Sequence, residues 1–255
     1  MYFKAFGLKD KRIRLLGGRQ RTELFVKQEY KEVWGAYQKD LYDFTLGYGY
    51  VELNGRIVFQ TALEDRRLQL EEFTRIIKST QPKTVLEIGA GSGLNLICLA
   101  ILFPDIHFTG LELTREGFEA FEAMLANPPV KVIQYLTGVS NIKIPKINFI
   151  VRSMLQLPFH DKTFDLTYSS MAIEQIPRDY KQVFKEAKRV TKEWCVFYEG
   201  FEDFQNFFQK MYRRKVDYFR GKTATLRRIG FKIISVRIPF SHIIYTNAFV
   251  ICKIL

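Results

Sequence analysis

The feature that most restricts the fold is a glycine-rich turn between an apolar strand and an apolar helix. The segment Val85–Asn95 reads VLEIGAGSGLN, so its glycines alternate with small residues. Glycines let the backbone turn sharply and let a ligand lie against it, and the first N–H groups of the following helix can bind an anion. The segment predicts a strand–turn–helix unit that cradles a nucleotide-like cofactor.

Short apolar runs alternate with helix-length segments after this turn, as in a doubly wound α/β fold. The last two runs leave no room for a helix between them and predict an antiparallel pair. We therefore expect a mostly parallel seven-stranded sheet with an antiparallel last strand. The predicted strands are Thr84–Ile88, His107–Glu112, Asn148–Arg152, Phe164–Ser169, Trp194–Glu199, Phe231–Ile238 and Ala248–Ile254.

The chain changes character near Gln81, and residues 1–80 are aromatic and basic. Helical spacing predicts helices at Glu29–Phe44 and Leu63–Ser79, around a stretch with glycines at Gly47–Tyr50. We expect residues 1–80 to form a helical cap or lid over an α/β core of residues 81–255.

An insertion at about residues 201–219 of the core is expected to form an amphipathic helix. With Tyr48 and Tyr50 of the N-terminal region, this helix is expected to roof the acceptor site. The alternatives are that it only packs on the core, or that it contacts a membrane surface or a second copy of the chain. Its predicted apolar face comprises Phe204, Phe207, Phe208, Met211, Tyr212, Val216 and Phe219. The opposite face comprises Gln205, Lys210, Arg213, Arg214 and Asp217.

The residues around the turn narrow the choice of cofactor. The dinucleotide fingerprint is G-x-G-x-x-G, whereas Gly89, Gly91 and Gly93 give G-x-G-x-G, with the acidic Glu87 just ahead. This pattern resembles motif I of the class I (Rossmann-like) S-adenosylmethionine-dependent methyltransferases. The resemblance implies that S-adenosylmethionine is the cofactor.

Further matches to the family follow in chain order. Glu112 ends the second strand, where the family places the carboxylate that binds both ribose hydroxyls. The segment Val151–Phe159 resembles the adenine-contacting stretch that ends in L-P-F, with Ser153 in place of the usual Asp. The cofactor contacts implied by the resemblance are Glu87, Gly89, Ala90, Gly91, Gly93, Glu112, Leu113, Ser153, Met154, Leu155 and Ser169.

The segment Phe164–Pro177 is similar to the family's fourth strand and active-site rim, with Gln175 where His is common. This resemblance implies that Glu174 lies near the transferred methyl group. There it acts as a base or orients the acceptor, or it caps a helix, and both readings stay open. The helix-to-strand step Leu226–Phe231 also resembles the step before the family's last strands.

No set of side chains indicates a metal centre or a nucleophile. His107, His160 and His242 are far apart and are expected to be structural or exposed, and no acidic cluster has metal-ligand spacing. We therefore expect a metal-independent enzyme. The dispersed residues Cys98, Cys195 and Cys252 are expected to be buried, reduced thiols.

The expected reaction is methyl transfer to an N or O nucleophile of a small-molecule acceptor, by in-line displacement. The formal net charge of +12 suggests a nucleic-acid partner, but net charge bears first on solubility and nonspecific binding, so a nucleic acid is the less favoured partner. The alternatives are an RNA or protein methyltransferase and a non-catalytic partner that only binds the cofactor. No apolar run reaches the roughly 20 residues of a membrane span, and Met1–Gly18 mixes aromatic with basic residues, so we expect a cytoplasmic protein. The sequence carries no signal for the acceptor's identity or the oligomeric state.

Overall fold

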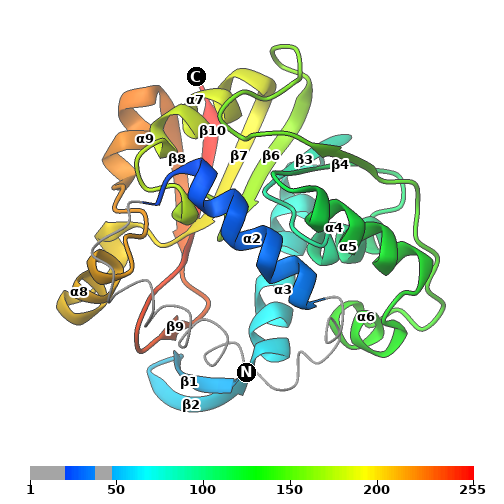
Figure 1. Cartoon of the computed structure of the whole chain (residues 1–255), viewed down its shortest axis with the longest axis horizontal. Helices are drawn as coiled ribbons and strands as arrows, with labels where there is room; N and C mark the ends of the chain where they lie inside the picture. The colour runs from blue at the N-terminus through cyan, green and yellow to red at the C-terminus, as the bar shows by residue number, and fades with distance from the viewer. Residues whose placement is uncertain (1–20, 38–47) are drawn as a thin grey trace.

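A seven-stranded sheet forms the centre of the molecule (Figure 1), in a computed structural model that describes residues 21–37 and 48–255. Its strand order is β5-β4-β3-β6-β7-β10-β8. Strands β3 to β7 pair in parallel, and β10 pairs antiparallel with both β7 and β8, which confirms the predicted sheet. The strands are β3 (Thr84–Ile88), β4 (His107–Glu112), β5 (Asn148–Val151), β6 (Phe164–Ser170), β7 (Thr191–Glu199), β8 (Phe231–Arg237) and β10 (Ala248–Ile254).

Helices cover both faces of this sheet. One apolar cluster joins the sheet to α3 (Ala62–Thr80), α4 (Leu94–Leu102), α5 (Arg115–Ala126) and α6 (Val130–Thr137). A second cluster joins the other face to α7 (Tyr180–Val190) and α9 (Thr223–Ile229). Although α3 precedes residue 81, it buries Leu70, Phe73 and Ile76 in the first cluster. It therefore belongs to the layers of the core.

The N-terminal region contains a β-hairpin besides its helices, which the prediction of a helical cap missed. Strands β1 (Tyr48–Leu53) and β2 (Arg56–Thr61) pair antiparallel around Asn54 and Gly55, whose φ angles are 52° and 76°. Asn-Gly favours this left-handed two-residue turn, so the signal was present. Strand β9 (Ser241–His242) joins β1 to complete a three-stranded sheet.

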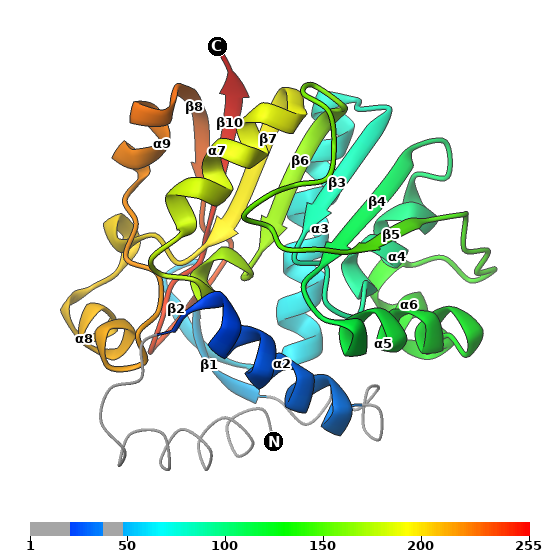
Figure 2. The ribbon, with the colours of Figure 1, turned by 45° about the horizontal axis from the view of Figure 1, so that its top comes forward.

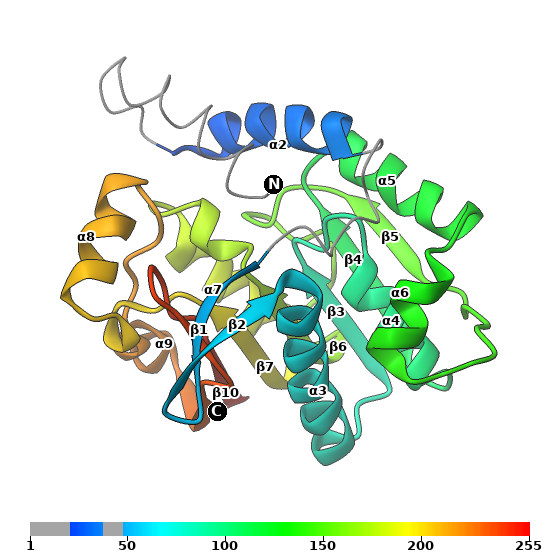
Figure 3. The ribbon, with the colours of Figure 1, turned by 90° about the horizontal axis from the view of Figure 1, so that it is seen from below.

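The first helix of the described residues is α2 (Glu23–Tyr37), which begins earlier than the predicted helix Glu29–Phe44. Residues 38–44 lie outside the described part of the chain. Figure 2 shows α2, the β1–β2 hairpin and α8 (Phe207–Lys215) at the end of the sheet towards which the parallel strands run. Seen from below in Figure 3, α2 passes on one side of these strand ends and the hairpin lies on the other.

Helix α8 forms within the predicted insertion, after a single turn η2 (Glu202–Phe204), but the prediction had its buried face wrong. Phe207 and Phe208 are 69% and 77% exposed, whereas Gln209 and Arg213 are buried. Gln209 closes a capping box with Asn206 and also donates to the His242 carbonyl, at 2.9 Å. Because buried polar groups must be hydrogen-bonded, these partners are what allow the polar face to point inward.

None of the described helices is both long enough and apolar enough to cross a membrane.

Candidate functional site

The glycine-rich turn joins β3 to α4 at the carboxyl edge of the sheet. Gly89, Gly91 and Gly93 have φ angles of 75°, 57° and 74°, in the left-handed region that glycine enters without strain. The N–H groups of Gly89 and Ala90 donate to the Leu111 carbonyl at 2.8 and 2.9 Å. The turn is thereby fixed to the end of β4.

The Glu112 carboxylate faces this turn from the end of β4. Gly91 N–H donates to its Oε2 at 3.0 Å, and Thr114 donates its N–H and its hydroxyl to Oε1 at 3.1 and 2.9 Å. A Cβ at Gly117 would lie 2.7 Å from the Glu112 Cγ, so the close approach needs glycine. Burial raises the pKa of Glu112, and the hydrogen bonds from Thr114 oppose that rise. The structure thus brings two predicted cofactor residues, Gly91 and Glu112, into direct contact.

Glu87 lies beneath the turn and is 2% exposed. Its Oε2 has no hydrogen-bond partner among the described residues, and burial raises the pKa of the carboxyl group to about 8. Nearby, Arg66 donates to the Asn95 side-chain oxygen at 3.0 Å. A buried acceptor without a partner is costly unless a ligand or a proton satisfies it. Glu87 therefore suits a ligand that carries a cationic or N–H donor group.

The segment after β5 approaches the same turn. The Met154 methyl group lies 3.6 Å from where a Gly89 Cβ would stand, so Met154 packs beside the turn. The Leu155 N–H donates to the Ser153 hydroxyl at 3.0 Å, and this hydroxyl in turn bonds to the Glu23 carboxylate of α2. Leu113 lines a groove between α2 and α5. Sequence reasoning missed Glu23, since it lies far from every motif.

Glu199 at the end of β7 organises the rim after β6. It is fully buried, and its Oε1 accepts from the Ser169 hydroxyl at 2.8 Å and from Ile173 N–H at 3.1 Å. Its Oε2 accepts from Glu174 N–H at 3.1 Å. The predicted cofactor residue Ser169 is therefore fully buried, and its hydroxyl is used by Glu199. The sequence signal that could have identified Glu199 as a site residue is its position at the carboxyl end of a parallel strand.

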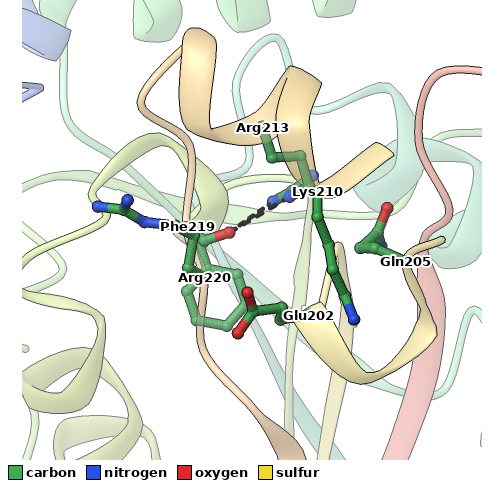
Figure 4. Close-up of a pocket in the computed structure, with 6 residues that line it drawn as sticks. All are labelled: Glu202, Gln205, Lys210, Arg213, Phe219 and Arg220. Carbon is green, nitrogen blue, oxygen red and sulfur yellow. Dashed lines mark hydrogen bonds between the residues drawn. The ribbon is translucent and has the colours of Figure 1, made fainter. Parts of the chain in front are cut away.

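The Glu174 carboxylate forms a buried ion pair with Arg213 of α8, at 3.3 Å. Arg213 also donates to the Phe219 carbonyl at 3.2 and 3.0 Å, and Figure 4 shows its head group directed towards that carbonyl. Burial raises the pKa of Glu174, and the Arg213 guanidinium opposes the rise. The single turn that holds Glu174 has no side-chain cap, so a capping role for Glu174 is not observed.

A second buried arginine, Arg21, connects the start of α2 to the same rim. It pairs with Glu29 on α2, and its Nη2 donates to the Gln175 side chain at 2.6 Å. The Tyr218 ring lies near both guanidinium groups, at 5.1 Å from Arg21 and 5.6 Å from Arg213. The rim near Glu174 is therefore polar, aromatic and tied to both covering helices.

His242 and the three cysteines are placed in ways that indicate a structural role. His242 Nε2 lies 2.8 Å from Asp65, and the three cysteines are buried and free, as predicted. In the described ranges, no three His, Cys, Asp or Glu side chains come together as metal ligands would.

Comparison with known proteins gives two sequence relatives and one structural neighbour of note. Residues 86–198 match the family model described as a methyltransferase domain. The ubiquinone/menaquinone biosynthesis C-methyltransferase of Rickettsia felis is 33% identical over 126 residues, which is 49% of this chain and 46% of that protein. The tRNA (guanine-N(7)-)-methyltransferase of Buchnera aphidicola is 32% identical over 80 residues, 31% of this chain and 29% of that protein.

The matched segments span less than half of these curated relatives. The crystal structure of magnesium protoporphyrin IX methyltransferase from Synechocystis, with bound SAH, superposes with a TM-score of 0.60 at 11% identity. That superposition covers 91% of this chain and 99% of the other, so the two share a fold. The segment 86–198 contains the glycine-rich turn, Glu112, Glu174 and most of the parallel sheet. The chain therefore resembles a methyltransferase domain in sequence over residues 86–198, and it shares its fold with a methyltransferase over nearly its whole length.

Proposed function

We propose that the chain transfers the methyl group of S-adenosylmethionine to an N or O nucleophile of a small-molecule acceptor. The observation that carries the proposal is the contact of Gly91 N–H with Glu112, beside the Glu87 oxygen that has no hydrogen-bond partner in the part of the chain that the structure describes. Together these groups offer a carboxylate for ribose hydroxyls and a second acceptor for an ammonium group. Both lie at the carboxyl edge of the sheet, where ligands bind in open α/β folds.

When bound, S-adenosylmethionine supplies a methyl group already activated by its sulfonium. The chain's own contribution is then to hold a nucleophile in line with the S–C bond and to exclude water. We assign the orientation of the acceptor to Glu174, because Arg213 fixes its carboxylate at the rim. We assign the cover of the acceptor site to α2, the β1–β2 hairpin and α8, which gather at that end of the sheet (Figure 2).

An RNA acceptor is the second candidate. It is favoured by the net charge of +12 and by the likeness to a protein named as a tRNA methyltransferase. The names of the two curated relatives specify a carbon and a nitrogen as the methylated atom, so likeness alone does not choose the acceptor. Incubation with labelled S-adenosylmethionine and separate pools of small phenols and amines, or of RNA, separates these candidates. Binding to RNA would also weaken steeply as salt is added.

The cofactor assignment is tested by calorimetry with S-adenosylhomocysteine. Glu112→Ala should weaken binding at least about tenfold, since hydrogen bonds to a charged group contribute roughly 1.5–3 kcal/mol each. Glu112→Gln, which keeps one acceptor oxygen, should lose less. Glu122→Ala on the exposed side of α5 removes the same charge away from the site and should leave the affinity unchanged.

Two results would contradict the proposal. Unchanged affinity in a folded Glu112→Ala protein would remove the ribose assignment. Tight binding of NADH by the wild type, with none of S-adenosylhomocysteine, would overturn the cofactor. Both proteins should be compared by thermal unfolding first, because Glu112 also holds Gly91 and Thr114.

A further inference from the structure

Helix α2 contacts the loop after β5 through the side chain of Glu23. Glu23, in the first turn of α2, hydrogen-bonds to the Ser153 hydroxyl in the loop after β5, although 130 positions separate them in the chain. The same helix packs along α5. Between the two helices lies a groove of about 400 Å³. The residues that line it are Leu24, Lys27, Gln28, Lys31, Leu113, Arg115, Glu116 and Val151.

The hydrogen bonds of Ser153 use its proton and one of its two acceptor lone pairs. Its hydroxyl accepts from Leu155 N–H at 3.0 Å and spends its only proton on Glu23. A carboxylate offers two oxygens with about four acceptor positions, so one bond from a hydroxyl leaves Glu23 with acceptor capacity. Next to this groove, the charged carboxylate of Glu23 is therefore a stronger acceptor for a ligand than the remaining lone pair of Ser153.

The other acidic groups nearby are matched to cations. Glu29 pairs with Arg21, and Glu116, which also lines the groove, pairs with Lys31 at 3.5 Å. The partner of Glu23 is a neutral hydroxyl instead. An N–H donor on a ligand can compete with that hydroxyl more easily than it could displace an arginine or a lysine.

The position of the groove selects the part of the ligand. Its lining includes Leu113, directly after Glu112, and also Leu24 and Val151, which are close in sequence to Glu23 and Ser153. If Glu112 binds the ribose, as the proposed function requires, the base attached to that ribose extends along this groove. The exocyclic amino group of adenine lies on the edge of the base remote from the sugar. We propose that Glu23 accepts a hydrogen bond from this amino group, so that α2 is part of the cofactor site.

This inference rests on the proposed function, and a change of ligand tests it separately. S-inosylhomocysteine carries an oxygen where the adenine amino group stands, and a carboxylate repels that oxygen. Calorimetry should show that the wild type binds S-adenosylhomocysteine at least about tenfold more tightly than the inosine analogue. In Glu23→Gln, whose amide can donate as well as accept, the preference should fall to about twofold or less.

A matched control comes from the same helix. Glu32→Gln removes one negative charge from an exposed position of α2 and should keep the full preference for adenine. The double variant Glu23→Gln with Ser153→Asp returns a carboxylate to the other side of the same contact and should restore most of the preference. A merely structural role for Glu23 would not produce that restoration.

The outcomes separate the two proposals. If the wild type binds neither ligand, the proposed cofactor and with it the proposed function are wrong. If the wild type binds S-adenosylhomocysteine and Glu23→Gln retains its preference for adenine, only the assignment of Glu23 is overturned. Loss of the preference in Glu32→Gln as well would show that the net charge of α2, and not a contact of Glu23, sets the choice of base.

Discussion

Helices α3 and α8 show the same periodicity in the sequence and face opposite ways in the structure. In α3 the apolar stripe, with Phe73 at its centre, packs in the core, and Phe73 is 1% exposed. In α8 the aromatic residues Phe207 and Phe208 face out, and Arg213 faces in at 2% exposure. Periodicity shows which residues share a face of a helix, whereas the acceptors available at the site decide which face is buried.

The hydrogen-bond acceptors that bury the polar face of α8 lie at the rim of the candidate site, near Glu174. Arg213 donates to the Phe219 carbonyl and pairs with the Glu174 carboxylate. Gly200 has no side chain and so leaves space for the Arg213 guanidinium, whereas a Cβ at position 200 would lie 2.2 Å from its Nη1. The buried face of α3 is mostly apolar, and its buried Glu72 pairs with Arg75 and Arg237. The inversion of α8 is therefore a consequence of what it packs against.

The largest expected effect comes from removing Arg213. Arg213→Met leaves the Glu174 carboxylate buried without its partner, and such a loss destabilises a protein by about 3–5 kcal/mol. Glu174→Gln in addition removes the unpaired charge and should recover at least half of that loss, as measured by urea unfolding. Because the glycine-rich turn lies outside this pair, affinity for S-adenosylhomocysteine should stay nearly intact while turnover falls.

An additive double variant would contradict this account. If Glu174→Gln brings no recovery in the Arg213→Met protein, the guanidinium stabilises α8 through the Phe219 carbonyl alone. The inward orientation of Arg213 on α8 would then depend on a backbone acceptor, and the ion pair with Glu174 would contribute nothing to stability.

The part of the site that could be predicted from sequence is the part built by consecutive residues. The turn Gly89–Gly93 and Glu112 lie at the ends of adjacent strands, and parallel pairing places those ends side by side. Glu23, Glu199 and Arg213 meet their partners only through folding, and no spacing in the chain announces such pairs. The β1–β2 hairpin lies between these two cases, because its Asn54-Gly55 turn is a local sequence signal for a hairpin.

The pH dependence of stability sharpens the comparison between paired and unpaired buried carboxylates. Glu174 has an arginine, whereas Glu87 has an oxygen without a partner among the described residues and a pKa raised by burial to about 8. Because the folded-state pKa is raised, the folded protein binds more protons than the unfolded one between the two pKa values. The stability from protonated Glu87 is fully present below the ordinary pKa of 4.5 and is lost as pH rises through about 8.

Glu87→Gln should remove this slope. Between pH 5 and 8 the free energy of unfolding of the wild type should fall by about 3.5 kcal/mol more than that of the variant, measured by urea unfolding at each pH. Glu52→Gln, at an exposed position of the hairpin, should follow the wild type. If the free energies of unfolding of wild type and Glu87→Gln changed equally with pH, the pKa of Glu87 would not be raised in solution.

The smallest expected effect concerns the outer face of α8. Phe207→Ser and Phe208→Ser should each change the free energy of unfolding by no more than about 0.5 kcal/mol, because side chains already 69% and 77% exposed lose little when they are replaced. Phe73→Ala in α3 is the matched case on the other side of the comparison, and truncation of that buried ring should cost about 3–5 kcal/mol. Equal losses in the two helices would show that α8 buries its aromatic face in solution. A loss at Phe207 and Phe208 that grows with protein concentration would show instead that another copy of the chain covers that face.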